Sequence, residues 1–343
     1  MPVPPSSTPE DPDLRDLRAA LKSRKAEARL AAIRRLARME GPEVDALLIQ
    51  AMRDRLSLLG AVAARALARR ATPEIADAMV DHFLWASEKG VERDPGCSVR
   101  VELARVFGEL HHYRAENALR TGIRTVQKEM VGFGLEDTAI AVRGECALAL
   151  AQIRPAGALI DIGLLLFDEE AQARASAARA LGSVGEAGAA PLLAIRLHVP
   201  DEPEVWIECM NSLAVLEEPR ALDLISPHLN SPDAFLAAGA AMALARTRRS
   251  DALPALLKAL DGADSDAVEP LAAAVATLRI PEARQALIDR TTVARRPLRA
   301  ACVRALQGFP DDSVQEILKK IAAEDNDPAV RLAASESLPM KPQ

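Results

Sequence analysis

The chain has 343 residues, is rich in Ala, Leu and Arg, and contains only 3% aromatic residues. Its net charge of −6 disfavours a protein built mainly to hold nucleic acid. The sequence contains no run of eighteen apolar residues, so we expect no membrane-spanning helix. Four cysteines and an N-terminus without a secretory signal pattern favour a reducing compartment, and we expect a cytoplasmic protein.

The chain begins with a Pro- and Ser-rich segment, residues 1–12, which we expect to be a disordered tail. A lone helix is predicted from Asp13 to Ser23, with Leu14, Leu17 and Leu21 facing inward, as suits the cap of a helical array. Helices and short breaks then alternate as far as a last predicted helix, Asp327 to Leu338. We expect one continuous array over residues 13–338, followed by a short tail over 339–343.

The stretch from Asp137 to Asp168 shows the repeating unit most clearly. Its first half places Val142, Cys146 and Leu150 on one helix face, and a second apolar helix follows a four-residue break. A unit this short cannot bury a core alone, so neighbouring units must stack. The register of Leu150 recurs about every thirty residues, at Leu36, Leu67, Phe107, Leu181, Leu213, Leu244, Leu278, Leu306 and Leu338.

Two further positions recur in this register. Four residues before the mark the side chain is small in nine of ten units, and Cys146, Cys209 and Cys302 take that place in three of them. We therefore expect buried thiols rather than metal ligands or disulfide partners. Arginine recurs seven residues before the mark, and Asp94, Asp137, Asp168 and Asp325 lie six residues before four of these arginines. An Asp there could cap a helix or pair with an Arg of an adjacent unit.

This pattern of Asp, Arg, small residue and Leu resembles HEAT repeats, in particular the short bacterial type of the phycobilin-lyase family. The phrases AVRGECALAL, AQARASAARALG and PAVRLAASESL carry the resemblance, which extends over nearly the whole chain. It implies an all-α, right-handed α-solenoid of about ten helical hairpins, without a β-sheet. It also implies a binding scaffold, because such repeats mostly bind other proteins.

Two segments interrupt the period, in adjacent units. They are Ala86–Gly96 and Lys128–Glu136, and we expect both to be surface loops that could be shortened with little loss of stability. Insertions in repeat proteins often map to a functional face, although neutral drift explains them equally well. The predicted partner-binding residues here are Trp85, Lys89, Glu92, Arg93, Met130 and Phe133. The apolar members would anchor a partner and the charged ones would form a polar rim.

Charge is distributed unevenly along the chain. Residues 158–233 contain thirteen acidic and four basic residues, whereas residues 1–70 contain nine acidic and fourteen basic ones. Such runs are usually solvated surfaces. The acidic middle nevertheless favours an electropositive partner, and we assign Glu202 and Glu204 to a second, electrostatic contact.

The sequence contains no recognisable catalytic or cofactor-binding motif, so we predict no catalytic residue, metal or cofactor. His111 and His112 are adjacent, which rarely lets both side chains reach one metal ion. The leading prediction is a non-catalytic scaffold that binds another protein along the second helices of its hairpins, without a membrane. A bilin-lyase-like enzyme acting on a protein-linked chromophore is the alternative. Nucleic-acid binding comes third and is disfavoured by the acidic middle and the few aromatic residues.

Overall fold

The computed structural model describes residues 12–186, 188–293, 295–309 and 311–338. They divide into two compact units, one ending at Ala180 and the other beginning at Leu181, so the division falls inside helix α11 (Ala171–Val184). The expected tails, residues 1–12 and 339–343, lie outside the described residues, except that α1 begins at Pro12. No helix in the described ranges is both long and apolar enough to cross a membrane.

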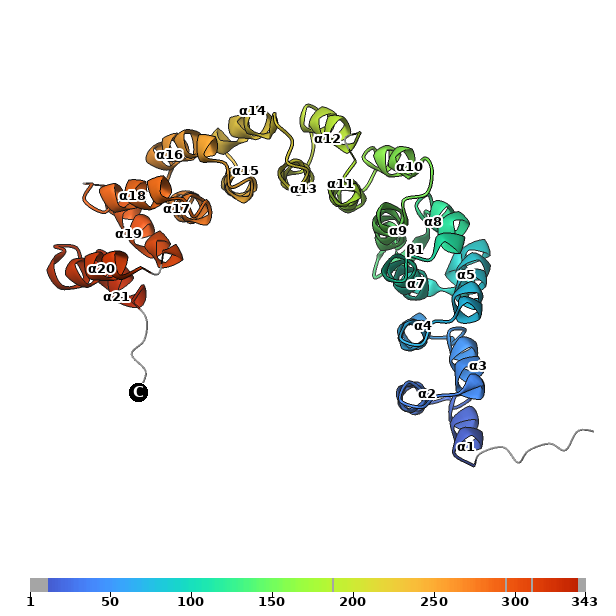
Figure 1. Cartoon of the computed structure of the whole chain (residues 1–343). Helices are drawn as coiled ribbons and strands as arrows, with labels where there is room; N and C mark the ends of the chain where they lie inside the picture. Colours follow the sequence, from blue (N-terminus) through green and yellow to red (C-terminus); the bar gives the residue numbers. More distant parts are fainter. Residues whose placement is uncertain (1–11, 187, 294, 310, 339–343) are drawn as a thin grey trace, which may run out of the picture. The chain divides into compact units, whose positions relative to one another are not determined.

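Helices of the first unit form two layers that alternate along the chain (Figure 1). The first layer carries the recurring Leu and Phe positions and contains α2 (Ala26–Leu36), α4 (Ser57–Ala68), α7 (Ser98–Glu109), α9 (Ile140–Ile153) and the start of α11. The second layer contains α1 (Pro12–Ala20), α3 (Pro42–Ala51), α5 (Pro73–Glu88), α8 (Glu116–Gly122) and α10 (Ala158–Leu165). Within the first layer α4 packs on α7 and α7 packs on α9.

The second unit repeats this arrangement. Its first layer continues with α13 (Pro203–Val215), α15 (Ala234–Arg246), α17 (Val268–Thr277), α19 (Arg296–Ala305) and α21 (Pro328–Glu336). Its second layer contains α12 (Ala189–Leu197), α14 (Ala221–Ile225), α16 (Leu253–Gly262), α18 (Pro281–Arg290) and α20 (Asp312–Glu324). Successive first-layer helices from α13 to α21 pack on one another, so a shared core runs along the unit.

The buried positions confirm the predicted solenoid. Nine of the ten recurring Leu and Phe side chains are at most 2% exposed, and only Leu338, at the end of the described chain, is half-buried. The small side chains four residues earlier are buried as well, and all four cysteines are free, buried thiols. A solenoid of stacked helical hairpins therefore forms each unit, and its core is the seam between first-layer helices.

Arginines of one hairpin pair with aspartates that begin the next. Three such pairs are Arg29–Asp54 at 2.6 Å, Arg143–Asp168 at 2.8 Å and Arg299–Asp325 at 3.1 Å. The same carboxylates accept hydrogen bonds from the backbone N–H groups of Leu56, Glu170 and Asp327, two residues further on. Each of these three Asp residues thus orders the turn before its own helix and also pairs with a guanidinium of the preceding unit, as the sequence suggested for Asp168 and Asp325.

One element contradicts the prediction of a chain without β-structure. Strands β1 (Lys128–Val131) and β2 (Gly134–Asp137) form an antiparallel hairpin in which Met130 lies opposite Leu135. The turn residue Gly132 has φ = +61°, a conformation that glycine adopts without strain. Glycine at the first of two turn positions matches the twist of a tight hairpin, which explains why this insertion is not an irregular loop.

Candidate interaction surface on the first unit

The first insertion is helical rather than a loop. Helix α5 continues to Glu88, the short helix α6 (Gly90–Arg93) follows, and a 3-10 turn (Pro95–Cys97) leads into α7. Asp94 lies between α6 and the 3-10 turn, and it is fully buried although it belongs to an inserted segment. Its carboxylate accepts hydrogen bonds from the backbone N–H groups of Val99 and Arg100, both at 3.1 Å, and so caps α7.

Arg100 links this buried turn to the second insertion. Its side chain is fully buried, and its Nε donates to Asp94 Oδ2 at 3.0 Å. Its Nη2 donates to the side-chain oxygen of Gln127, the residue immediately before β1. A Cβ atom on Gly90 would stand 1.9 Å from that same oxygen, so any other residue at position 90 would have to displace the Gln127 side chain. The two insertions are therefore packed against each other around one buried guanidinium.

The β-hairpin is anchored to the same network. Glu129 accepts hydrogen bonds from the Gly96 backbone N–H at 2.9 Å and from Gln127 Nε2 at 2.5 Å, and it also bonds Thr138. At the base of the second strand, the Asp137 carboxylate accepts a hydrogen bond from the Gln127 backbone N–H at 3.0 Å and pairs with Arg143 at 2.7 Å. The hairpin is therefore held by charged hydrogen bonds at its base and is not a loosely attached loop.

The electrostatics of the anchor favour ionised carboxylates. Burial opposes ionisation of Glu129, but hydrogen bonds from Thr138, Gln127 and the Gly96 amide hold its pKa below the ordinary value. Burial likewise opposes ionisation of Asp137, and two backbone amides together with Arg143 lower its pKa. Both groups therefore remain charged at neutral pH, where they attract the donors that fix the hairpin.

The outer face of the hairpin is apolar and exposed. Because side chains alternate along a strand, Met130 and its cross-strand partner Leu135 share the face opposite to Glu129. Met130 is 70% exposed, Leu135 64%, and Phe133 at the turn extends fully into solvent. We call Met130, Phe133 and Leu135 the hairpin face. Exposed apolar side chains gathered on one small element are typical of an interaction site.

The structure places the other predicted site residues around the two insertions. Lys89 and Glu92 are exposed and form an ion pair at 3.4 Å, while Arg93 pairs with Glu88 at 2.7 Å. Trp85 is half-buried, because the guanidinium groups of Arg53 and Arg93 lie 4.8 and 4.7 Å from its ring centroid. Its ring therefore offers less free apolar surface than the sequence suggested.

Glu202 and Glu204 belong to the second unit, at the start of α13, and both are exposed. Part of the surrounding acidic excess is already paired. Asp161 in the first unit contacts Arg120 and Arg124, and Asp201 contacts Arg196. The sequence count therefore overstates the charge available to a partner.

The expectation that both insertions could be shortened with little loss of stability stays a prediction, but the buried pair of Asp94 and Arg100 argues against it for the first segment. Shortening the first segment would remove Asp94 and leave Arg100 buried without its carboxylate, a change that typically costs several kcal/mol. Sequence reasoning also missed Leu135 as an exposed residue. The two-residue Gly-Phe turn between the runs KEMV and GLED was the signal that could have revealed the hairpin and its alternation.

Comparison with known proteins agrees with the helical architecture. Residues 131–214 match the family model for HEAT repeats. The karyopherin Kap121p, in its complex with Pho4p, aligns with 96% of this chain and 41% of its own at 13% identity, with a TM-score of 0.54. The chain has a HEAT-repeat fold. Its HEAT array spans less than half the length of that karyopherin.

Two other solved structures resemble this HEAT-repeat chain less closely. One is an engineered protein with 20% identity, covering 95% of this chain and 98% of its own, at a TM-score of 0.41. The other is the complex of CpcE and CpcF of phycocyanin lyase from Nostoc sp. PCC7120, with 18% identity, 73% and 93% coverage, and a TM-score of 0.41. No curated protein sequence matches the chain.

Proposed function

We propose that the chain is a protein-binding scaffold and that the hairpin face is the centre of its contact with a partner protein. The observation that carries this proposal is the combination of exposed Met130, Phe133 and Leu135 with a buried, charged anchor beneath them. Covering an apolar face with a partner lowers the free energy of the complex, whereas its exposure to water does not stabilise the free protein.

The anchor favours binding because it orders the hairpin in advance. A flexible loop loses conformational freedom when it binds, which reduces affinity, whereas a pre-organised element avoids most of that cost. Glu129 and Asp137 hold both strands at their base, so the hairpin face is presented in one conformation. Lys128 and Glu136 are exposed beside it and would form the polar rim of an interface, together with the ion pair of Lys89 and Glu92.

Kap121p was solved in complexes with other proteins, so HEAT arrays of this architecture do act as protein-binding surfaces.

Four free thiols, all buried, suit a reducing compartment, and we place this scaffold in the cytoplasm. Binding along the second-layer helices and an electrostatic contact at Glu202 and Glu204 remain predictions.

A triple variant, Met130→Ser, Phe133→Ser and Leu135→Ser, tests this function directly. It removes the hairpin face without touching the anchor, so the thermal melt should be unchanged while partner recovery from extracts of the source cell falls at least tenfold. The matched control replaces three scattered and similarly exposed residues, Leu58, Phe235 and Leu332, with Ser. Equal recovery of the same proteins by both triple variants would contradict the proposal.

A photo-reactive phenylalanine analogue at position 133 gives a second readout. Phe133 extends fully into solvent, so the analogue should form a cross-link to the partner, and the same analogue at position 58 should not.

Addition of a bilin separates this function from the lyase-like alternative. A scaffold leaves the visible spectrum of the bilin unchanged, whereas an enzyme that acts on a bilin shifts it.

A further inference from the structure

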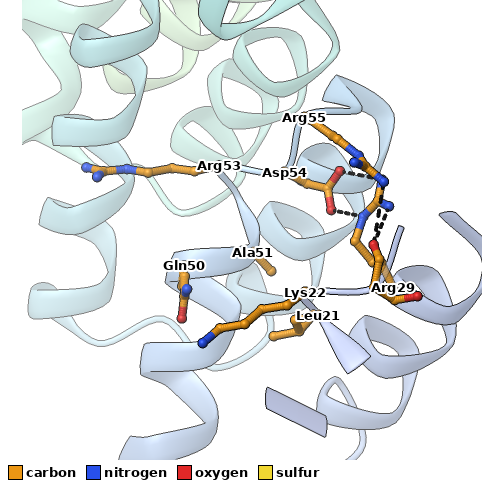
Figure 2. A pocket seen from close by; sticks show the side chains of 9 residues that line it. Leu21, Lys22, Arg29, Gln50, Ala51, Arg53, Asp54 and Arg55 are labelled. Carbon is orange, nitrogen blue, oxygen red and sulfur yellow. Dashed lines mark hydrogen bonds and ion pairs between the residues drawn. The ribbon is translucent and has the colours of Figure 1, made fainter. Parts of the chain in front are cut away.

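A basic cleft lies in the first unit, well away in sequence from the two insertions. It has a volume of about 440 Å³ and is formed where the chain leaves α1 and where α3 joins α4 (Figure 2). Four basic side chains line it, Lys22, Arg29, Arg53 and Arg55, against a single acidic one, Asp54. The formal charge of the lining is therefore +3 in a protein whose net charge is −6.

One ion pair forms the wall of the cleft. Arg29 donates from Nε to Asp54 at 2.6 Å and from Nη2 at 3.0 Å, and its Nη1 donates to the carbonyl oxygen of Ser23 at 3.0 Å. This pair neutralises Asp54 and fixes the wall. Arg55 donates to the carbonyl oxygen of Arg24 at 2.5 Å, which holds its guanidinium beside the opening. The positive charges of Lys22, Arg53 and Arg55 thus remain uncompensated.

Arg53 is held in place without using its hydrogen-bond donors. Its guanidinium lies 4.8 Å from the centroid of the Trp85 ring, and it makes no hydrogen bond or ion pair within the described part of the chain. Arg93 contacts the same ring at 4.7 Å, and His82 lies 5.2 Å away, so Trp85 is itself supported. Stacking therefore orients a guanidinium whose N–H groups are all available to a ligand.

The free cations extend to the same side of the cleft. Figure 2 shows the Lys22 ammonium and the Arg53 guanidinium reaching away from the Arg29–Asp54 pair, with Gln50 between them. Lys22 forms no ion pair with any described residue, and its side chain is exposed. An ammonium, an amide and an oriented guanidinium provide separate sets of donors, which suits an extended chain with more than one anionic oxygen group.

We propose that this cleft binds an acidic peptide segment of a partner protein, with an Asp or Glu carboxylate paired with Arg53 and a second carboxylate near Lys22. The planar guanidinium of Arg53 matches the two oxygens of a carboxylate. A nucleic acid fits less well, because the Trp85 ring, on which a base would have to stack beside Arg53, is already covered by guanidinium groups.

The test uses three fluorescent probes with the full-length protein. They are an eight-residue peptide alternating Glu and Gly, the same peptide with Gln for Glu, and a single-stranded oligonucleotide of matched charge. Fluorescence polarisation should show binding of the acidic peptide at 50 mM salt, weaker binding at 300 mM, and none of the Gln peptide. A preference for the oligonucleotide, or no binding of the acidic peptide, would overturn the proposal.

Two double variants with the same change of charge locate the site. Lys22→Ala with Arg53→Ala should weaken binding of the acidic peptide at least tenfold. Arg34→Ala with Arg38→Ala, both exposed on or next to α2 outside the cleft, should change it less than twofold. Equal losses in the two variants would mean diffuse attraction and no site. Arg53→Lys retains the charge but not the planar fork, so it should weaken binding severalfold while the circular dichroism melt stays the same.

The cleft and the hairpin face can be tested independently. The triple Ser variant of the hairpin face should bind the acidic peptide as the unaltered protein does. A hairpin variant that loses partner recovery but retains peptide binding therefore distinguishes failure of one proposal from failure of the other.

Discussion

His82 shows how a single buried side chain makes stability depend on pH. It is 3% exposed, lies against Trp85, and its Nε2 has no hydrogen-bond partner within the described chain. Burial, together with the nearby charge of Arg53, lowers its pKa from 6.5 to about 4, although Asp94 opposes the shift. The unfolded chain therefore takes up a proton at His82 in a pH range where the folded chain does not.

The sign of the effect follows from that difference in proton uptake. Neutral His82 contributes its full stability above pH 6.5, and the contribution is lost as the pH falls from 6.5 towards 4. We expect a loss of roughly 2 kcal/mol between pH 7 and pH 5. Urea unfolding of the protein and of His82→Gln at both pH values measures it. The variant should be less stable at pH 7, and the gap should narrow at pH 5; parallel pH dependences would refute the prediction.

Cys146 tests the tight seam between α9 and the second-layer helix α8. It is fully buried, its pKa is raised by burial, and a Cβ atom on Gly122 would stand 2.3 Å from its sulfur. Cys146→Leu adds volume where none is available and should cost roughly 1–3 kcal/mol. Cys146→Ala removes volume and serves as the control for loss of the thiol. A melting temperature unchanged by Leu would show that the seam is looser than the structure indicates.

At the scale of elements, the two insertions behave as one because Glu129 joins them. Glu129→Ala removes one acceptor each from the exposed Gly96 amide, from Gln127 and from Thr138, while Gln127 Nε2 keeps the Asp94 carbonyl and the Thr138 hydroxyl keeps the Gln127 carbonyl as acceptors. We expect a loss of about 1–3 kcal/mol and faster hydrogen exchange in both 90–97 and 128–137. Glu136→Ala is the matched control, since Glu136 lies directly opposite in the hairpin but is exposed. Faster exchange confined to the hairpin would mean that the insertions are independent.

The repeat was predictable because it depends on local periodicity. The register of Leu150, the small side chains at the seam and the cysteine environment all follow from spacing along one helix face, and the structure confirms each of them. The interaction surface was less predictable. The hydrogen bonds of Asp94 with Ser57 and Gln127 and the stacking of Arg53 on Trp85 join segments more than thirty residues apart, and such contacts leave no periodic signal.

At the scale of the whole molecule, the basic cleft illustrates the same limit. The positive excess in residues 1–70 was visible in the sequence, but its meaning depends on which charges are already paired. Arg29 is neutralised by Asp54, whereas Lys22 and Arg53 remain available, and only the folded chain separates these cases. Counting charges along the sequence therefore located the region of the cleft but not the residues that form it.

The pairing of arginines with later aspartates gives the array a polarity. A truncation that removes the hairpin beginning at Asp168 leaves Arg143 with only Asp137 and without its later carboxylate. A truncation that removes the hairpin of Arg143 instead leaves Asp168 still bonded to the backbone of its own turn. Loss of repeats from the C-terminal side therefore removes one of two carboxylates from a buried arginine, whereas loss from the N-terminal side leaves a carboxylate that still accepts a backbone hydrogen bond. Fraying of each unit should accordingly be easier from its N-terminal end, and shortened versions are best built by removing hairpins from that end.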